Sequence, residues 1–273
     1  MKLLALDTAT STAGIALVDR PAPPFGGAAG RGSPAVEGDR VLAEARHDTA
    51  GRGADLLVAI DRLCRAAGVA PAELDAIAIG AGPGSFTGLR IGMATAKGIA
   101  FAAGRPLWAV SSLAALADDA QRELDGDPRS DVVICAALDA RRGEVFAGCF
   151  ARGVALAPER VLSPDELVAW AQSMAERAQE PEPTTTSAGG TASAHAPLVF
   201  AGDAIVAHPA LAGVDAWGAR WLAARTPSGL AVARLALAGA RVDITLGGAP
   251  TYIRPSEAEV KYPDGVPGAL RRR

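Results

Sequence analysis

A glycine-rich segment that follows an apolar run constrains the fold more than any other part of the chain. Residues 80–92 are GAGPGSFTGLRIG, and they follow the apolar run 76–80, which is typical of a buried strand. A helix is predicted to follow and to end near Ala103, because Gly104 is a favourable helix stop. A strand, a glycine turn and a helix in this order could hold a phosphate group.

The spacing of this segment is a weak match to the known phosphate-binding loops. A Rossmann loop would need glycine at position 87, where the chain has Thr87. A P-loop would need a lysine next to its last glycine, but the first lysine, Lys97, lies well inside the predicted helix. Pro83 also lacks the backbone N–H that a phosphate cradle uses.

Small residues recur at every fourth position of the same helix. The row consists of Gly84, Gly88, Gly92, Ala96, Ala100 and Gly104. Such a row forms one ridge of the helix, and without large side chains it allows another backbone to approach closely. Gly88 and Gly92 together should destabilise the helix by about 1–2 kcal/mol, so close packing is expected to offset this cost. The pattern leaves open whether the packing partner is the protein's own sheet or another chain.

The remaining pattern predicts an α/β protein with two halves. Strands are expected at residues 3–6, 14–19, 41–45, 76–80, 107–110, 132–138, 144–150 and 198–201. Helices are expected at 54–67, 85–103, 112–120, after an N-cap at Ser163, and at 228–240.

The expected domain division places residues 1–106 in a first domain, which the helix at about 228–240 rejoins. Residues 107–225 form the second domain, and 241–273 an irregular tail. Residues 21–38 are predicted to be a loop. Residues 179–197 almost lack large apolar groups, so a disordered insertion is expected there.

Composition excludes several classes of protein. The net charge of −3 argues against a free-standing nucleic-acid binder. Three scattered cysteines indicate buried free thiols in a reducing compartment, and neither cysteine nor histidine shows a metal-binding spacing. No uncharged apolar run is long enough for a membrane span, and Asp7 comes too early for a signal-peptide core, so a cytoplasmic protein is expected.

Five segments in order resemble the motifs of one family, the TsaB (formerly YeaZ) proteins. They are residues 80–92, Asp7-Thr8-Ala9-Thr10, Ser111-Ser112-Leu113, DARRGEVF at 139–146, and Thr251-Tyr252-Ile253-Arg254. One departure is Gly53, which stands where family members often carry histidine in R-H-[SA]-E.

The resemblance implies the actin/Hsp70/hexokinase-like (ASKHA) fold, with two ribonuclease H-like repeats. It also implies a dimerisation subunit of the machinery for N6-threonylcarbamoyladenosine at position 37 of tRNA (t6A37). The implied partners are a TsaD-like catalytic subunit, a TsaE-like ATPase and, through the complex, tRNA, with a homodimer when the chain is alone. ATP and Mg²⁺ would be used by the complex. No cofactor or metal is expected on this chain, and by itself it is not expected to be an enzyme.

The site residues implied by the resemblance fall into two sets. The helices 54–67 and 85–103 would dock against the partner through Asp55, Leu56, Ala59, Leu63, Ser85, Thr87, Gly88, Gly92 and Ala96. A vestigial nucleotide site would comprise Asp7, Thr8 and Thr10, although these residues could equally form a hydrogen-bonded Asx or Thr turn.

The role of the segment 139–143 also has two interpretations. Arg141 and Arg142 stand where nucleotide-using members of the fold have bare backbone, and they could bind an anion or form a solvated turn salt-bridged to Glu144. The alternative function for the whole chain is an ATP-dependent phosphotransferase or a glycoprotease-like peptidase of the same fold, which would use Asp7 and the cleft between the domains.

Overall fold

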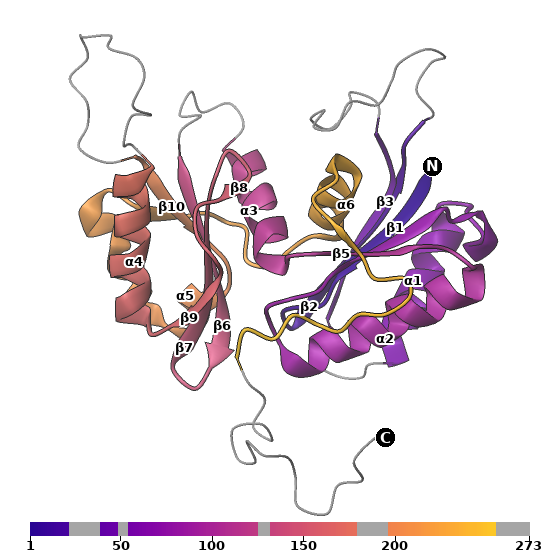
Figure 1. Ribbon diagram of the computed structural model, residues 1–273, viewed down its shortest axis with the longest axis horizontal. Coiled ribbons are helices and arrows are strands. Elements are labelled where there is room, and N and C mark those ends of the chain that lie inside the picture. The colour runs from indigo at the N-terminus through magenta and orange to yellow at the C-terminus, as the bar shows by residue number, and fades with distance from the viewer. Residues whose placement is uncertain (22–38, 49–53, 125–131, 179–195, 255–273) are drawn as a thin grey trace, which may run out of the picture.

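The chain folds around two β-sheets (Figure 1). The structure, a computed structural model, describes residues 1–21, 39–48, 54–124, 132–178 and 196–254. The first sheet contains β1 (Lys2–Asp7), β2 (Thr12–Asp19), β3 (Arg40–Asp48), β4 (Ala76–Gly80), β5 (Leu107–Val110) and β12 (Val242–Asp243). The second contains β6 (Val133–Arg141), β7 (Glu144–Ala151), β8 (Val154–Ala155), β9 (Arg160–Leu162), β10 (Leu198–Ala201) and β11 (Arg220–Trp221).

The two sheets repeat one arrangement of strands. The first runs in the order β12-β5-β4-β1-β2-β3, and the second in the order β11-β10-β6-β7-β8, with β9 also paired to β7. In each half an antiparallel hairpin comes first, β1–β2 or β6–β7, and the later strands β4 and β10 lie parallel to its first strand. The turns of the two opening hairpins therefore occupy equivalent places in the two halves.

Helices cover both faces of the sheets. They are α1 (Ala54–Ala66), α2 (Phe86–Ala103), α3 (Ser112–Glu123), α4 (Pro164–Arg177), α5 (Ala204–Ala207) and α6 (Gly229–Ala238), with 3-10 turns at Pro71–Glu73 and Pro209–Trp217. In Figure 1, α1 and α2 lie on the outer side of the first sheet, α4 and α5 on the outer side of the second, and α3 and α6 between the sheets. Within the described part of the chain, none of these helices is long and apolar enough to cross a membrane.

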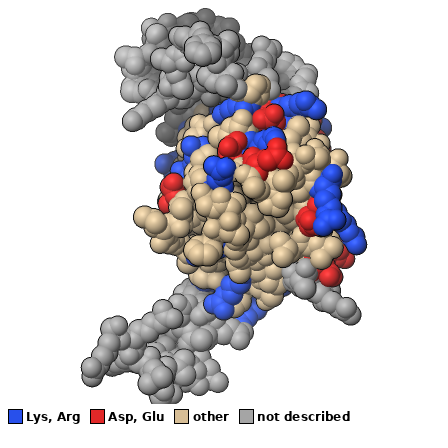
Figure 2. Space-filling view, turned by 90° about the vertical axis from the view of Figure 1, so that its right-hand side faces the viewer, with Lys and Arg blue, Asp and Glu red and all other residues tan. Residues whose placement is uncertain are grey.

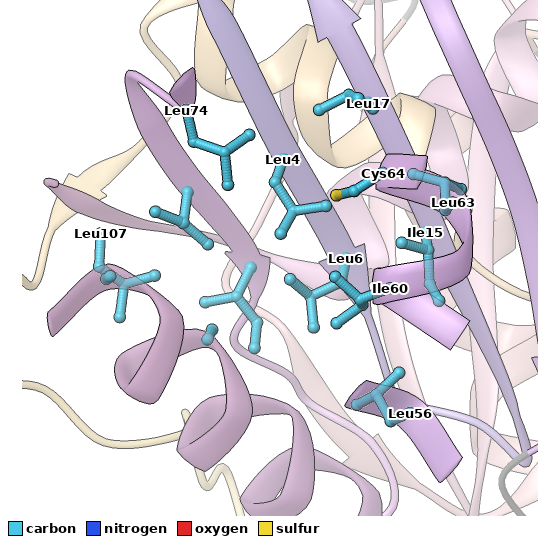
Figure 3. Close-up of a cluster of buried hydrophobic side chains, with 14 of the residues drawn as sticks. Leu4, Leu6, Ile15, Leu17, Leu56, Ile60, Leu63, Cys64, Leu74 and Leu107 are labelled. Atoms are coloured by element: carbon cyan, nitrogen blue, oxygen red, sulfur yellow. The ribbon is translucent and has the colours of Figure 1, made fainter. Parts of the chain in front are cut away.

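Burial on both faces explains the apolar strands. Leu4 and Leu6 of β1 face the cluster under α1 and α2, where Leu56 and Ile60 of α1 meet them (Figure 3). The alternate residues of β1, such as Leu3, pack against α6 on the other face. Because side chains alternate along a strand, a strand with helices on both sides reads as a continuous apolar run.

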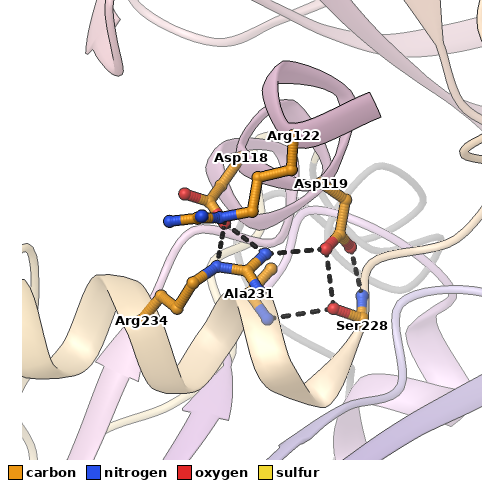
Figure 4. A network of polar contacts seen from close by, with 6 residues as sticks. All are labelled: Asp118, Asp119, Arg122, Ser228, Ala231 and Arg234. Carbon is orange, nitrogen blue, oxygen red and sulfur yellow. Dashed lines mark hydrogen bonds and ion pairs between the residues drawn. The ribbon is translucent and has the colours of Figure 1, made fainter. Parts of the chain in front are cut away.

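A polar network joins the two helices between the sheets (Figure 4). Ser228 caps α6 and donates from Oγ to Asp119 Oδ1 of α3 at 2.7 Å. Arg234 of α6 donates from Nε to Asp118 Oδ2 at 2.6 Å and from Nη2 to Asp119 Oδ1 at 3.0 Å. Burial raises the pKa of Asp118, and the Arg234 guanidinium opposes that shift. The network fixes α6, which packs on the first sheet, against α3, which packs on the second.

The predicted fold class and most elements are confirmed. Ser85 is the N-cap of α2, Gly104 ends it in the left-handed conformation, and Ser163 forms the capping box of α4. All three cysteines are buried free thiols. The domain boundary near residue 106 stays a prediction, although β5, which we had assigned to the second domain, pairs with β4 in the first sheet. The predicted loop 21–38 and insertion 179–197 lie almost entirely outside the described residues.

Candidate functional site

A cavity of about 790 Å³ lies where the two halves meet. Most of its lining comes from the β1–β2 turn, the first turn of α2, the β6–β7 hairpin and the segment 251–254, and Asp203 before α5 joins them. Both turns that the sequence singled out, one from each half, therefore lie at one cavity. The two turns differ in what they present to it.

The first turn keeps its carboxylate out of the cavity. Asp7 is fully buried, its Oδ1 accepts from the Ala9 N–H at 2.7 Å, and its Oδ2 accepts from Ser112 Oγ at 2.6 Å. Burial raises the pKa of Asp7 to about 6, against the opposing effect of these hydrogen bonds. Ser112 Oγ in turn accepts from the Gly82 N–H at 3.1 Å.

Asp7 thus joins the end of β1, the glycine turn and the start of α3. Gly80 leaves the space that this arrangement needs, since a Cβ there would lie 1.7 Å from Asp7 Oδ2. Asp7 forms the hydrogen bond of an Asx turn, with the Ala9 N–H donating to its Oδ1. Only Thr8 and Thr10 of the proposed vestigial nucleotide site line the cavity. Within the described residues, no group of three or more His, Cys, Asp or Glu side chains is placed to hold a metal ion.

The glycine row of α2 packs on the same turn. A Cβ at Gly88 would lie 2.2 Å from the Thr8 carbonyl oxygen, and one at Gly92 would lie 2.2 Å from Thr8 Oγ1. The close packing that the row predicted is therefore inside the chain. Our placement of Gly88, Gly92 and Ala96 at an approach of another chain is wrong, because all three are buried against the protein's own core.

The second turn presents arginines. Arg142 and Gly143 are its two central residues and both have positive φ, 59° and 80°, while Arg141 at the end of β6 has φ of 63°. Arg141 pairs with Asp139 at 3.2 Å. Glu144 forms an ion pair with Arg254 at 3.0 Å. The Arg141 side chain remains largely exposed.

The segment 251–254, here called the strap, crosses from one half to the other. The Thr251 N–H donates to the Ala81 carbonyl at 2.7 Å, and Tyr252 lies against Phe86 with ring centroids 5.5 Å apart. At the far end, Arg254 Nη1 donates to the Ala140 carbonyl at 2.6 Å. In Figure 1 this stretch runs along α2 to the lower end of β6.

Arg90 contacts both members of the aromatic pair, Phe86 and Tyr252, at the cavity rim. Its guanidinium carbon lies 3.8 Å from the centroid of the Phe86 ring, and its Nε donates to the Tyr252 hydroxyl at 3.1 Å. No local pattern in the sequence marks Phe86, Arg90 or the bridging role of Arg254. The motif at 251–254 stands out in the sequence, but nothing there says that it returns to α2.

The outer face of α1 and α2 carries exposed apolar side chains. Leu57 and Val58 of α1 are 55% and 47% exposed, and Phe101 of α2 is 91% exposed. Of the remaining predicted interface residues, Asp55, Ser85 and Thr87 are exposed and Ala59 is half-buried, whereas Leu56 and Leu63 belong to the core. The predicted interface set therefore combines residues from the exposed and the buried faces of the two helices. Whether this face binds a partner stays a prediction.

Comparison with known families identifies relatives in one pathway. The model of a family described as "TsaD: tRNA N6-adenosine threonylcarbamoyltransferase" matches residues 53–239. A "tRNA threonylcarbamoyladenosine biosynthesis protein TsaB" from Haemophilus influenzae is 33% identical over 183 residues, which are 67% of this chain and 65% of that protein. Its Bacillus subtilis namesake is 34% identical over 151 residues, 55% of each chain. The chain thus matches about half to two thirds of the length of these curated relatives.

Solved structures agree with the sequence relatives. A Pseudomonas aeruginosa structure described as an uncharacterized protein with similarity to peptidase YEAZ has a TM-score of 0.61 and 29% identity, and the alignment covers 93% of this chain and 99% of that one. YeaZ from the same species has a TM-score of 0.60 and 28% identity, covering 92% and 99%. The family match over more than half of the chain and these relatives together show that the chain belongs to the TsaB (YeaZ) family.

Proposed function

We propose that this chain is a non-catalytic scaffold subunit of a complex that makes t6A37 in tRNA. It binds a TsaD-like catalytic subunit and, with it, a TsaE-like ATPase, and it meets tRNA through the complex. The support is the family together with the names of the curated relatives, which place those proteins in threonylcarbamoyladenosine biosynthesis.

The observation that carries the proposal is the exposed apolar face of α1 and α2. An exposed apolar patch of this kind marks interaction surfaces in soluble proteins. Figure 2 faces the right-hand side of Figure 1, where the first half lies, and its centre is a broad area without charged side chains. On α1, Asp61 and Arg65 form an exposed ion pair at 2.9 Å, which suits the polar rim of an interface.

The buried state of Asp7 supports a non-catalytic role. The alternative, a phosphotransferase or peptidase of the same fold, would need this carboxylate at the cleft to bind a metal ion or to activate a nucleophile. Both Asp7 oxygens instead accept hydrogen bonds from within the chain, and the side chain does not line the cavity. We therefore favour the scaffold over the enzyme.

The test is a charge placed in the apolar face. Phe101→Asp and Val58→Asp are expected to abolish co-purification with the TsaD-like subunit, because a carboxylate buried at an interface without a partner is strongly unfavourable. Val206→Asp is the matched control, since Val206 of α5 is also 72% exposed but lies on the other half. All three variants should keep the wild-type thermal midpoint. Pairing that survives both face variants would refute the docking proposal.

A further inference from the structure

Two of the three cysteines lie opposite each other on neighbouring strands of the second half. Cys135 is on β6 and Cys149 is on β7, and the register of the hairpin pairs one directly with the other. Directly opposite residues of an antiparallel pair project from the same face of the sheet. Both side chains are fully buried in the apolar cluster that also contains Trp170 and Met174 of α4. This pair is remote from the proposed docking face, which belongs to α1 and α2 of the other half.

The backbone hydrogen bonds place the two cysteines in the closer kind of cross-strand pair. The Cys149 carbonyl oxygen accepts from the Leu156 N–H at 2.9 Å, on the side of β8. The N–H and C=O groups of one strand residue point to the same side, so Cys149 and Cys135 share no backbone hydrogen bond. The Cα atoms of such a pair lie about 4.5 Å apart, within the range of roughly 4.4–6.8 Å that disulfides span.

The two thiols interact directly. Burial raises the pKa of the Cys135 thiol well above its usual value, and a hydrogen bond with Cys149 raises it further. A thiol with a raised pKa holds little thiolate, the form that reacts with oxidants. The folded pair therefore stays reduced until a local opening of the strands admits solvent and an oxidant.

The third cysteine differs in having no thiol beside it. Cys64 of α1 is a buried free thiol that belongs to the apolar cluster of the first half. Burial raises the pKa of this thiol as well. A sulfenic acid formed on Cys64 would have no thiol of the same cluster to react with, whereas one formed on Cys135 would meet Cys149. Cys64 is therefore an internal reference for the pair.

We propose that Cys135 and Cys149 are a reversible redox pair, which a peroxide converts to a disulfide that ties β6 to β7. The first thiolate attacks one oxygen of hydrogen peroxide, the O–O bond breaks, and a sulfenic acid and hydroxide form. The second thiolate attacks that sulfur, the S–S bond forms and a second hydroxide leaves. The two thiol protons convert both hydroxides to water. Two thiols and one peroxide thus give one disulfide and two water molecules, and a dithiol reductant reverses the change.

The experiment treats the full-length folded chain with excess hydrogen peroxide, blocks the remaining thiols with iodoacetamide in urea, and maps the products by mass spectrometry. Trypsin cuts after arginine, so the three cysteines fall in separate peptides, residues 63–65, 130–141 and 143–152. The test variant is Cys135→Ala. The matched control is Cys64→Ala, which also removes a buried thiol but leaves the pair intact.

In the wild type and in Cys64→Ala, we expect peptides 130–141 and 143–152 to be joined within a single chain and to separate after dithiothreitol. Peroxide should raise the thermal midpoint of both proteins by at least about 5 °C, because the bond restrains the unfolded chain. Cys135→Ala should form no such link, and its midpoint should not rise. This variant also corrects for any effect of methionine oxidation, since its methionines are those of the wild type.

Three results would each overturn the proposal. The two peptides could remain unlinked in excess peroxide, either thiol could accumulate as a sulfinic acid, or the link could join two different chains. All three are measured on the wild type, so they decide the matter even if Cys135→Ala does not fold. A linked hairpin with an unchanged thermal midpoint would refute the tie between β6 and β7.

Discussion

The two hairpin turns at the cavity occupy equivalent places in the two halves, yet the charged side chains of the first are buried and those of the second are exposed. The β1–β2 turn holds a buried carboxylate, Asp7, and small neighbours let α2 pack directly on its backbone. The β6–β7 turn exposes Arg141. The same hairpin unit therefore connects packed elements in the first half and presents an exposed, charged surface in the second.

The physical origin of the difference lies in what surrounds each turn. The first turn meets α2 and the start of α3, so its buried carboxylate needs hydrogen-bond partners inside the chain. The Ala9 N–H and Ser112 supply partners to Asp7. The second turn faces the cavity and solvent, where charged side chains keep their hydration. Four changes to the chain test this difference between the two turns.

The largest effect is expected for the packing of α2 on the first turn. Gly88→Ala would place a methyl group 2.2 Å from the Thr8 carbonyl oxygen, so we expect a loss of at least about 3 kcal/mol in the free energy of unfolding. Gly98→Ala in the same helix is the control, because its Cβ would meet nothing within 4 Å, and it should gain about 0.5–1 kcal/mol. Urea denaturation of both variants measures this. Equal effects of the two changes would show that α2 does not pack on the turn as described.

The second effect concerns the charge state of Asp7. Its folded pKa of about 6 lies above the usual 3.8, so the folded state binds the proton more tightly than the unfolded state. The contribution of Asp7 to stability is therefore largest at low pH and is lost as pH rises from about 4 through about 6. Relative to Asp7→Asn, the wild type should lose up to about 3 kcal/mol over this window and change little above pH 7. Denaturation midpoints of both proteins from pH 4 to pH 8 measure the difference, and a difference independent of pH would contradict a buried, ionisable Asp7.

The third effect concerns the strap that ties the second turn to α2. Arg254→Ala removes the hydrogen bond to the Ala140 carbonyl and the partly exposed ion pair with Glu144, so we expect a loss of about 1–2 kcal/mol. Arg220→Ala, at an exposed position of β11, should stay within about 0.5 kcal/mol of the wild type. Thermal unfolding compares the two. If both changes are neutral, the strap does not hold the halves together.

The smallest effect should come from relieving the backbone strain of the second turn. Arg142→Asn gives Asn-Gly, the residue pair that a turn with positive φ at both positions favours, and should raise the free energy of unfolding by about 0.5–1 kcal/mol. Arg152→Asn, in the turn that Arg152 and Gly153 form at the other end of β7, should gain about the same amount. Urea denaturation of both variants measures the change. A loss of stability on Arg142→Asn would mean that the arginine side chain itself stabilises this turn.

Much of the fold followed from local patterns. The apolar run before Gly80, the caps Ser85 and Ser163, and the stop at Gly104 predicted elements that the structure confirms, because these signals act within a few residues. The glycine row also predicted close packing correctly. It could not name the partner, since periodicity records only that a small ridge exists and not what lies on it.

The candidate site was less predictable, because its parts come from several distant segments. By itself, the sequence determined the α/β order, the helices and the two unusual turns, since those depend on spacing and turn chemistry. Only the tertiary structure decided that Asp7 is buried, that Gly88 and Gly92 pack on Thr8, and that Arg254 and Tyr252 reach the second turn and α2. The reason is physical: the burial and partners of a side chain depend on contacts with residues remote in the chain, and no local pattern encodes them.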